Sequence, residues 1–408
     1  MTISSLSSTV GKLLAKLSVA TLLWLTVVVY AHMFASSESD EDKNNDLILD
    51  KNNFNHDAYR RMRVSHSAEA LEGQELVDYV NGRQNLWTAT SNNKFAKYTK
   101  EEKKQLMGVL NVRNPIKARR NMSPTRYMDI QLPESFDSRK QWGSMCRSVT
   151  EVRDQSSCGS CWSFGAVEAM SDRICIHSNG SIQVDLSAKD LLSCCKACGF
   201  GCNGGEPFEA WSFWHTSGIV TGSNYTTKKG CQPYTFPECE HHSTKAHFKP
   251  CPKELYPTPK CEKTCQEGYD KEYNADKYYG QEPYAVDEDQ EAIKKELYLN
   301  GPLEVSFEVY DDFLTYSGGV YVHQGGRIDG GHAVKLVGWG TENEVPYWIV
   351  ANSWNTDFGE DGYFRILRGS NECGIESGVV GGLPDLKRSP HRVHYHHHHS
   401  SASSYDIF

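Results

Sequence analysis

Residues 155–170 read QSSCGSCWSFGAVEAM and place a cysteine, Cys161, at the predicted start of an α-helix. The first turn of a helix carries unpaired N–H groups and about half a positive charge, which favours a thiolate over a thiol. Gln155 lies six residues upstream, and a second cysteine, Cys158, lies in the turn between them. We therefore interpret Cys161 as a nucleophile rather than a packing residue.

The pair Cys158 and Cys161 also has the C-x-x-C spacing of a redox centre or of half a zinc site. No thioredoxin-like βαβ pattern surrounds the motif, which argues against a redox centre. A zinc site would need a second pair of ligands. The cysteines that could supply them are Cys194, Cys195, Cys198 and Cys202.

The composition and the N-terminus indicate a secretory route. The 408 residues suffice for one large or two moderate domains, and a net charge of −9 without a basic stripe argues against a nucleic-acid partner. Lys12 and Lys16 precede an uncharged stretch, residues 17–35, so we predict a signal peptide over residues 1–35. An uncleaved signal anchor is the alternative, because this stretch of 19 uncharged residues reaches the minimum span. Either route leads to an oxidising lumen, where disulfides form.

The cysteines divide the chain. All fourteen fall between Cys146 and Cys373, whereas residues 36–131 are polar and contain none. We predict that residues 36–131 are a removable pro-segment that covers a cleft, with a flexible linker as the alternative. Helical spacing occurs within it at residues 69–81 and 98–110. The tail, residues 387–408, is rich in His and Ser and is predicted to be a disordered end, with metal binding as the alternative.

The body, residues 132–386, has a helical half followed by a β-rich half. Helical patterns start at Cys161 and run over residues 206–218. Strand-like runs follow, and the first of them alternates between apolar and polar residues. These runs are residues 303–309, 333–339, 347–352 and 363–367. The order predicts an α+β fold of two domains with a cleft between them.

A thiolate needs a cationic partner, and histidine is the usual one; the β-rich half offers a candidate histidine and an amide that could orient it. His332 lies in GGHAVKLVGWG, where glycines allow the backbone to approach a nucleophile closely. Asn352 ends the next strand-like run, and its amide could hold the imidazole in one tautomer while Trp354 shields the bond from water. Together with Cys161 and Gln155, these residues form one predicted catalytic group.

Residues 158–162 satisfy the pattern C-G-[SA]-C-[WY] of papain-family nucleophiles. Residues 132–386 resemble papain-family cysteine peptidases, and within them the cathepsin B group; ELVDYVN (75–81) and LWTA (86–89) resemble that group's pro-segment. The resemblance implies a papain-like two-domain fold, with a helical left domain, a β-barrel-like right domain and no cofactor. It implies Cys161 as nucleophile, His332 as general base and then acid, and Asn352 as orienting residue. The side chain of Gln155 and the N–H of Cys161 would form the oxyanion hole.

His332 lies 171 residues after Cys161, which exceeds the roughly 130–150 of papain-like enzymes and indicates an insertion at residues 231–265. This insertion resembles the occluding loop that makes cathepsin B a peptidyl-dipeptidase. His241 and His242 would then bind the substrate's terminal carboxylate, with a zinc site as their alternative role. Asp154 is implied as the latch for His241.

A second tether in that group joins a loop arginine to an aspartate, here Asp357. The loop position holds Phe248 with Lys249 beside it, so we expect a loop that opens readily and more endopeptidase activity.

The resemblance also implies the substrate-binding residues, the disulfides and a further free thiol, Cys373. Gly378 occupies the position where cathepsin B carries an acid, so we expect apolar P2 residues to be preferred over arginine; Glu206 could partly substitute. The implied substrate-binding residues are Gly204, Gly205, Glu206, Pro207, Ala333, Trp354 and Gly378. The implied disulfides are Cys146–Cys175, Cys158–Cys202, Cys194–Cys261, Cys195–Cys198, Cys231–Cys265 and Cys239–Cys251. Predicted glycosylation sites are Asn121, Asn179 and Asn224.

The function that follows is a zymogen of a secreted or lysosome-type cysteine protease for general protein degradation, with no metal. Its expected partners are peptide and protein substrates, its own pro-segment and cystatin-type inhibitors. We expect a monomer with no stable membrane association after processing. YWIVANSWNTDFGE (347–360) resembles a segment of gut peptidases from blood-feeding worms, so a gut lumen is one candidate site of action. The alternatives are a non-catalytic disulfide-rich binding protein of the same fold and a thiol-redox enzyme.

Overall fold

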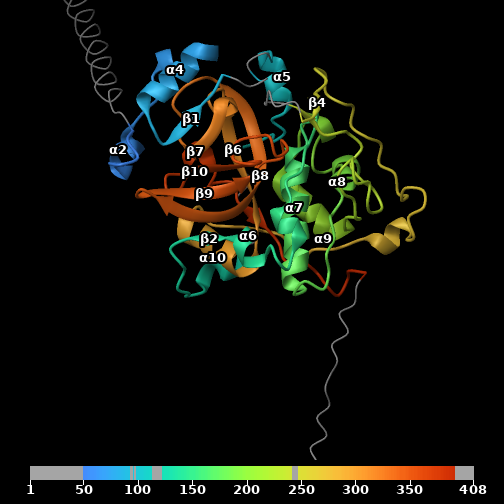
Figure 1. Ribbon diagram of the computed structural model, residues 1–408. Coiled ribbons are helices and arrows are strands. Elements are labelled where there is room, and N and C mark those ends of the chain that lie inside the picture. The colour runs from blue at the N-terminus through green and yellow to red at the C-terminus, as the bar shows by residue number, and fades with distance from the viewer. Residues whose placement is uncertain (1–48, 92–94, 96–97, 113–121, 241–246, 391–408) are drawn as a thin grey trace, which may run out of the picture.

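The computed structural model describes residues 49–91, 95, 98–112, 122–240 and 247–390. A helical half and a half built around a large sheet lie side by side (Figure 1). The predicted signal segment, residues 1–35, and residues 391–408 of the tail lie outside the described part of the chain. Within the described part, no helix has the length and apolar character needed to cross a bilayer.

The helical half is organised around α7 (Cys161–His177), which begins at the cysteine where the sequence predicts a helix to start. Residues 161–175 are all buried, so this helix forms the centre of the molecule rather than one of its faces. α9 packs against it, beginning at Pro207, where the missing N–H costs nothing, and ending before Gly218 at φ 67°. The other helices of the body are α6 (Ser138–Trp142), α8 (Ala188–Cys194), α9 (Pro207–Ser217) and α10 (Gln290–Asn300).

The described strands of the other half form one sheet with the order β1-β7-β10-β9-β8-β6-β11-β5, and β2 also pairs with β8. The path does not return from β5 to β1, so the β-barrel-like domain is an open sheet rather than a closed barrel. The strands are β1 (Trp87–Ala89), β2 (Phe136–Asp137), β5 (Tyr284–Ala285), β6 (Leu303–Tyr310), β7 (Tyr316–Tyr321), β8 (Ile328–Glu342), β9 (Val345–Ala351), β10 (Tyr363–Leu367) and β11 (Val380–Gly381).

The strand β6 differs from the alternation predicted for residues 303–309. Residues 303–307 are all buried, because one face of β6 packs in the sheet core and the other faces the helical half. Glu304 is therefore buried, and its carboxylate accepts a hydrogen bond of 2.8 Å from the indole of Trp211 on α9. Burial raises the pKa of Glu304 well above its usual value.

Charged side chains also join the two halves. Lys335 on β8 donates to Asp172 on α7 at 3.0 Å and lies 3.8 Å from Glu168, and all three side chains are buried. Removing one member of such a cluster leaves an uncompensated buried charge, which costs about 3–5 kcal/mol. The cluster therefore fixes α7, with Cys161 at its start, against the strand that carries His332.

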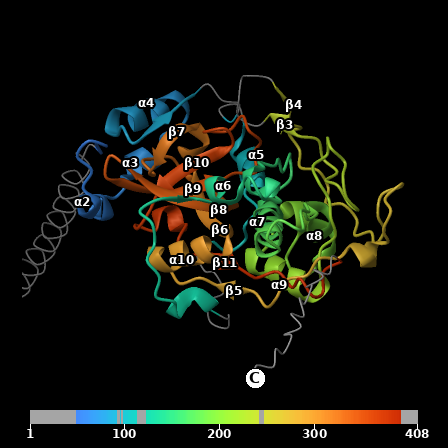
Figure 2. The ribbon, with the colours of Figure 1, turned by 60° about the horizontal axis from the view of Figure 1, so that its bottom comes forward.

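The leader, residues 49–112 where described, lies along the end of the sheet and then crosses toward α7 (Figure 2). β1 extends the sheet through β7, and α4 buries Leu76, Val77 and Val80 at the predicted helical spacing. The leader helices are α2 (His56–Arg61), α3 (His66–Glu69), α4 (Gly73–Arg83) and α5 (Lys100–Gln105).

The helix predicted over residues 98–110 is wrong in its second half. α5 begins with a capping box between Thr99 and Glu102 but ends at Gln105. Beyond it the backbone bonds to other segments: Val109 donates to Gly331 at 3.0 Å, and these tertiary bonds replace the helical ones. The leader is therefore extended where it passes the start of α7.

Candidate active site

Cys161 is the first residue of α7, is fully buried, and packs with Ala333 of β8 and with two leader valines. The neighbouring Cys158 is bonded to Cys202, so Cys161 has no local disulfide partner. This arrangement excludes the redox and zinc roles that the C-x-x-C spacing left open. Among the described residues no group of three or more His, Cys, Asp or Glu is arranged to hold a metal ion.

His332 lies within β8, four residues after its start, opposite Phe307 of β6. Its Nε2 lies 2.8 Å from Oδ1 of Asn352, the residue that follows β9. Because that amide oxygen can only accept, Nε2 carries the proton and Nδ1 is free to take another. Nδ1 has no hydrogen-bond partner in the described part of the chain. The Trp354 ring lies 4.8 Å from the imidazole and is itself buried, as the shielding role requires.

Gln155 is held from three directions. Its Oε1 accepts from Ser353 Oγ at 2.8 Å, its backbone N–H donates to Ser353 at 2.9 Å, and its carbonyl accepts from Tyr234 at 2.8 Å. Its Nε2 donates to the carbonyl of Cys158 at 2.7 Å and to the carbonyl of Leu106 in the leader at 3.0 Å. The leader thus supplies a peptide carbonyl to a donor that is predicted to bind an oxyanion.

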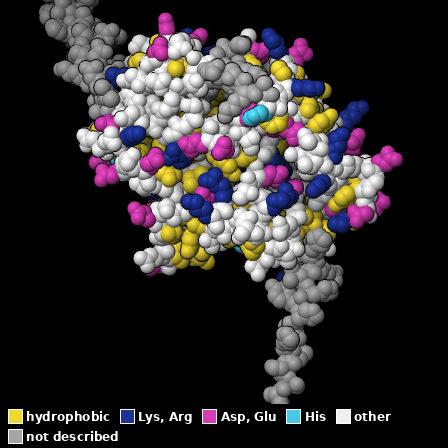
Figure 3. Space-filling model, viewed as in Figure 1, with side chains coloured by type: hydrophobic (Ala, Val, Ile, Leu, Met, Phe, Trp, Pro, Cys, Tyr) yellow, Lys and Arg dark blue, Asp and Glu magenta, His cyan; other side chains and the backbone are white. Residues whose placement is uncertain are grey.

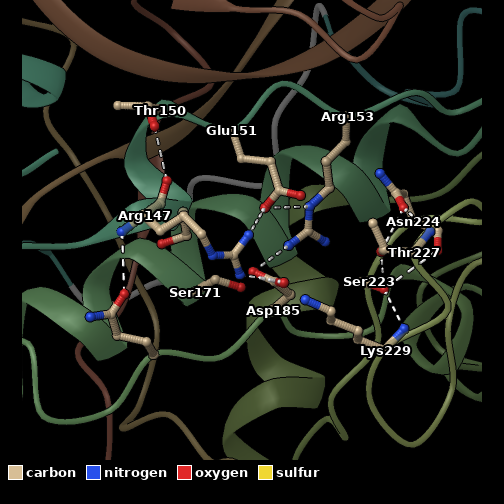
Figure 4. A network of polar contacts seen from close by, with 12 residues as sticks. Arg147, Thr150, Glu151, Arg153, Ser171, Asp185, Ser223, Asn224, Thr227 and Lys229 are labelled. Carbon is tan, nitrogen blue, oxygen red and sulfur yellow. Dashed lines mark hydrogen bonds and ion pairs between the residues drawn. The ribbon is translucent and has the colours of Figure 1, made fainter.

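The segment that leads into Gln155 is anchored by a polar network, shown in Figure 4. Arg153 is buried, donates to the carbonyl of Leu186 at 3.0 Å, and lies 3.7 Å from both Glu151 and Asp185. Arg147 donates to the same Asp185 at 2.6 Å. Two arginines and two carboxylates therefore fix the backbone two residues before Gln155, which limits the movement of its side chain.

The leader backbone passes directly over the nucleophile. The N–H of Gly108 donates to Sγ of Cys161 at 3.2 Å, and the Gly108 carbonyl accepts from Gly205 at 2.8 Å. Val109 forms bridges to both Gly205 and Gly331, so the leader pairs with one edge from each half of the molecule. Gly204 lies at φ 109° beside this edge, a conformation that favours glycine. This is the β-augmentation expected for a peptide in the cleft.

Burial beneath the leader sets the protonation of both catalytic candidates. It raises the pKa of the Cys161 thiol to about 12, even though the nearby N–H groups of Ala333 and Gly108 act to lower it. It lowers the pKa of His332 to about 4, against the opposing hydrogen bond to Asn352. Burial therefore disfavours the charged form of both groups and opposes a thiolate–imidazolium pair in the covered site.

Glu206 and Pro207 of the helical half line one pocket together with Ser306 and Gly378 of the other half. The leader enters it, and the amide of Asn111 donates to the Glu206 carboxylate. Gly378 offers no side chain there, so Glu206 is the carboxylate that lines this pocket among the described residues. The predicted substrate-binding residues Gly204, Gly205, Ala333 and Trp354 lie around the same cleft.

The inserted loop, residues 231–265, is attached to the segment that carries Gln155. Ser156 and Ser157 donate to the carbonyls of Pro237 and Pro252, each at 2.7 Å. Within the loop, β3 (Cys239–Glu240) pairs with β4 (Lys249–Pro250). His241 and His242 lie outside the described residues. The proposed latch residue Asp154 accepts from the N–H of Cys239 in the inserted loop at 3.0 Å, and its contact with His241 stays a prediction.

A tether to Asp357 exists, contrary to the expectation drawn from Phe248. His247, one residue earlier, places Nδ1 2.6 Å from Oδ1 of Asp357. The family pattern has an arginine at position 248, whereas here a histidine one residue earlier reaches the same carboxylate. The loop is therefore tethered by a group that carries charge only when protonated.

The cysteines pair in the six combinations that the resemblance implies. Cys161 and Cys373 are free, and burial together with Glu372 raises the pKa of the Cys373 thiol well above its usual value. Of the predicted glycosylation sites, Asn179 is exposed, Asn224 is half-buried and Asn121 lies outside the described residues. Figure 3 shows acidic and basic side chains interspersed on one face rather than gathered into a basic stripe.

Comparisons with known proteins agree with this geometry. The sequence profile of the papain family of cysteine proteases matches residues 132–383. Cathepsin B-like cysteine proteinase 6 of Caenorhabditis elegans is 58% identical over 380 residues, which cover 92% of this chain and 97% of that protein. Cathepsin B-like cysteine proteinase of Schistosoma japonicum is 47% identical, over 80% of this chain and 95% of that one. The solved structure of procathepsin B S9 from Trypanosoma congolense is similar with a TM-score of 0.65 and 39% identity, covering 76% of this chain and 98% of that chain.

Proposed function

This chain belongs to the papain family of cysteine proteases, as a cathepsin B-like member, and we propose from this that residues 36–131 are its inhibitory pro-segment. The observation that carries the proposal is the contact of the leader with two functional groups. The Gly108 N–H lies on Sγ of Cys161, and the Leu106 carbonyl lies on the amide of Gln155. The enzyme hydrolyses peptide bonds. The alternative, a non-catalytic binding protein, explains neither the contact at Cys161 nor the contact at Gln155.

The catalytic steps follow from the residues in the cleft. After the leader departs, His332 takes the proton of Cys161 through Nδ1, and Asn352 stabilises the imidazolium through Nε2. The thiolate attacks the carbon of the scissile carbonyl group. The carbonyl oxygen becomes an oxyanion and accepts hydrogen bonds from the Gln155 amide and the Cys161 N–H. The imidazolium protonates the leaving amine, and a water molecule deprotonated by His332 then hydrolyses the thioester.

The leader escapes cleavage because it crosses the cleft in the opposite direction to a substrate. From Lys103 to Asn111 it runs from Asp311, past Gln155 and Cys161, to the Glu206 pocket. A substrate with its P2 residue in the Glu206 pocket would instead run from that pocket toward Asp311.

Titration with an irreversible epoxide inhibitor of thiol proteases, before and after acid activation, tests whether the full chain is a zymogen. We expect stoichiometric labelling of Cys161 only after activation; equal labelling before it would contradict the proposal.

We propose peptidyl-dipeptidase activity together with endopeptidase activity, governed by the loop at residues 231–265. His241 and His242 are the candidates for binding the terminal carboxylate of a substrate. The attachment of the loop base to residues 154–157 supports this role, because it fixes the loop beside the oxyanion glutamine.

Replacing His247 with alanine will raise endopeptidase activity relative to dipeptidase activity by several-fold at pH 5. The contact between His247 Nδ1 and Asp357 Oδ1 holds the wild-type loop, and the alanine variant lacks it. The measurement is the ratio of kcat/KM for a blocked internal peptide to that for a peptide with a free C-terminus, between pH 4.5 and 7.5.

The matched control is Lys249→Ala, which removes a neighbouring exposed charge outside the tether. A ratio for His247→Ala that equals the wild-type ratio at pH 5 would contradict a role of the tether in restraining the loop.

Replacing Gly378 with glutamate will increase the preference for arginine over leucine at P2 by about tenfold, because a partly buried charged pair is worth ~1.5–3 kcal/mol. A Cβ at this position would lie 3.3 Å from Cβ of Ser306, a contact that a small shift relieves. Gly378→Ala is the control, since it adds the Cβ without the carboxylate. Peptides that differ only at P2 give the ratio of kcat/KM; the proposal of an apolar P2 preference fails if wild-type enzyme already cleaves arginine peptides faster than leucine peptides.

We propose that the protein travels the secretory pathway to a lysosome-like compartment or to the outside of the cell. Six disulfides and an exposed sequon at Asn179 support this route. Its proposed partners remain peptide and protein substrates, its own pro-segment and cystatin-type inhibitors, with the mature enzyme a monomer.

A further inference from the structure

Two aspartates at the edge of the cleft have no part in the mechanism above. Asp311 follows β6, and Asp329 lies on β8 three residues before His332. In the pairing of these strands Val309 lies opposite Gly330 and Tyr310 lies opposite Ile328, so Asp329 is the extra residue of a β-bulge. Bulges change the direction in which a side chain points and occur often beside active sites.

The Asp329 carboxyl group is buried without the donors that a carboxylate needs. Only 3% of the residue is exposed, and among the described residues its carboxyl group faces no hydrogen-bond donor other than the carboxyl group of Asp311. Burial, and next the charge of Asp311, raise the pKa of Asp329 to about 7. Two carboxyl groups in one place cannot readily both ionise, and an added cation relieves that conflict.

The cation present in the full chain comes from the leader. Lys103 of α5 places Nζ 2.7 Å from Oδ1 of Asp311, and the two side chains are only 20% and 11% exposed. The positive charges of Lys103 and Lys100 act to lower the pKa of Asp329. On the other side, Oδ2 of Asp311 accepts from the backbone N–H of Arg327 at 3.1 Å. Removal of the leader therefore takes away the lysine ammonium group that faces the two acids.

The path of the leader places this pair relative to the scissile bond. Lys103 is followed by Leu106 at the oxyanion glutamine, Gly108 at Cys161 and Asn111 at Glu206. The acidic pair thus lies on the opposite side of Cys161 from the Glu206 pocket. Since that pocket takes P2, the pair lies on the side of the leaving group.

We propose that Asp311 and Asp329 form a cation-binding subsite of the mature enzyme, which selects substrates with lysine or arginine in the first two positions after the scissile bond. The proposal rests on the proposed function, in which the leader is a removable pro-segment. Lys103 then occupies the subsite in the zymogen as a substitute for the substrate's basic side chain. One ammonium or guanidinium group of the substrate would then take the place of Lys103 at Asp311.

The test compares activated wild-type enzyme with Asp311→Asn, Asp329→Asn and the double variant on internally quenched peptides. The peptides carry either lysine or norleucine at the first or second position after the scissile bond. We expect wild type to favour lysine by about tenfold in kcat/KM at one of these positions, and the double variant to lose that preference. Glu344→Gln, an exposed acid in the turn between β8 and β9, is the matched control and should keep it.

A peptidyl aminomethylcoumarin substrate separates this proposal from the proposed function, because its leaving group has no side chain. Its hydrolysis should stay within about twofold in every variant. No hydrolysis by wild type would contradict the proposed function; normal hydrolysis with no lysine preference, or with a preference retained by the double variant, would overturn the subsite.

A second measurement uses inhibition by the leader and needs no substrate with a side chain after the scissile bond. The leader polypeptide, residues 36–131, should inhibit hydrolysis of the coumarin substrate by wild-type enzyme, and Lys103→Met should weaken that inhibition by about tenfold. The wild-type leader and the Lys103→Met leader should inhibit the double variant equally. If Lys103→Met weakens inhibition of the wild-type enzyme and of the double variant equally, Lys103 does not act through the two aspartates, and the subsite is overturned.

Discussion

Replacing Cys161 with alanine will lower the rate of peptide hydrolysis by a factor on the order of 10⁶, the scale found when the nucleophile of a catalytic triad is removed. No other described residue can supply the attacking atom, because Cys161 is the thiol that the Gly108 N–H contacts and that packs against Ala333 beside His332. The measurement is kcat on a coumarin substrate after removal of the leader by an added protease.

Cys373→Ser is the matched control, since Cys373 is the other free cysteine. It lies beside Glu372 in the turn after β10, outside the cleft described above, and its replacement should leave kcat within about twofold. A Cys161→Ala enzyme that retains activity within tenfold of wild type, or a Cys373→Ser enzyme that loses it, would contradict the assignment of the nucleophile.

Replacing Gly108 with valine will release the leader from the cleft and weaken its inhibition of the mature enzyme by about a thousandfold. A Cβ at Gly108 would lie 2.1 Å from the carbonyl oxygen of Gly159 and 3.1 Å from Sγ of Cys161. No rotamer relieves a clash between Cβ and backbone, so the leader must move away and lose its bonds to Gly205 and Gly331. The inhibition constant of the leader polypeptide, residues 36–131, measures the effect.

Gly82→Ala is the control for this prediction. Gly82 lies in α4 of the same leader, and a Cβ there would meet nothing within 4 Å. Its replacement should leave inhibition unchanged. If Gly108→Val inhibits as well as the wild-type leader, the leader does not act by the close approach of its backbone to Cys161.

The parts of the site that the sequence predicts correctly are those that local chemistry determines. The start of α7 at Cys161 follows from the turn residues before it, and the end of β9 before Asn352 follows from its β-branched run. The disulfide pairs could not be derived by counting, since many pairings are compatible with the same spacing. They required the resemblance to a family.

The remaining features depend on contacts between distant segments. α5 stops at Gln105 because Val109 finds partners in Gly331 and Gly205, and no local pattern contains that information. β6 is buried on both faces because a helical half packs on one of them, which hides the alternation. The tether at His247 does not follow from the family pattern, because that pattern has an arginine at position 248 and the histidine that reaches Asp357 lies one residue earlier. In each case the tertiary partner, rather than local propensity, determines the outcome.

We propose that the leader holds Cys161 as a neutral thiol and that its removal creates a reactive thiolate. Burial raises the pKa of Cys161 to about 12 and lowers that of His332 to about 4 in the full chain. The most direct measurement is the rate at which iodoacetamide alkylates Cys161, followed by mass spectrometry from pH 4 to 9 in the full chain and in the activated enzyme. In the activated enzyme we predict a high alkylation rate that stays constant from about pH 5 to 7, as an imidazolium-paired thiolate gives. In the full chain we predict a rate at least about a hundredfold lower, which rises steadily with pH. Equal rates with the same pH profile in both forms would contradict the account.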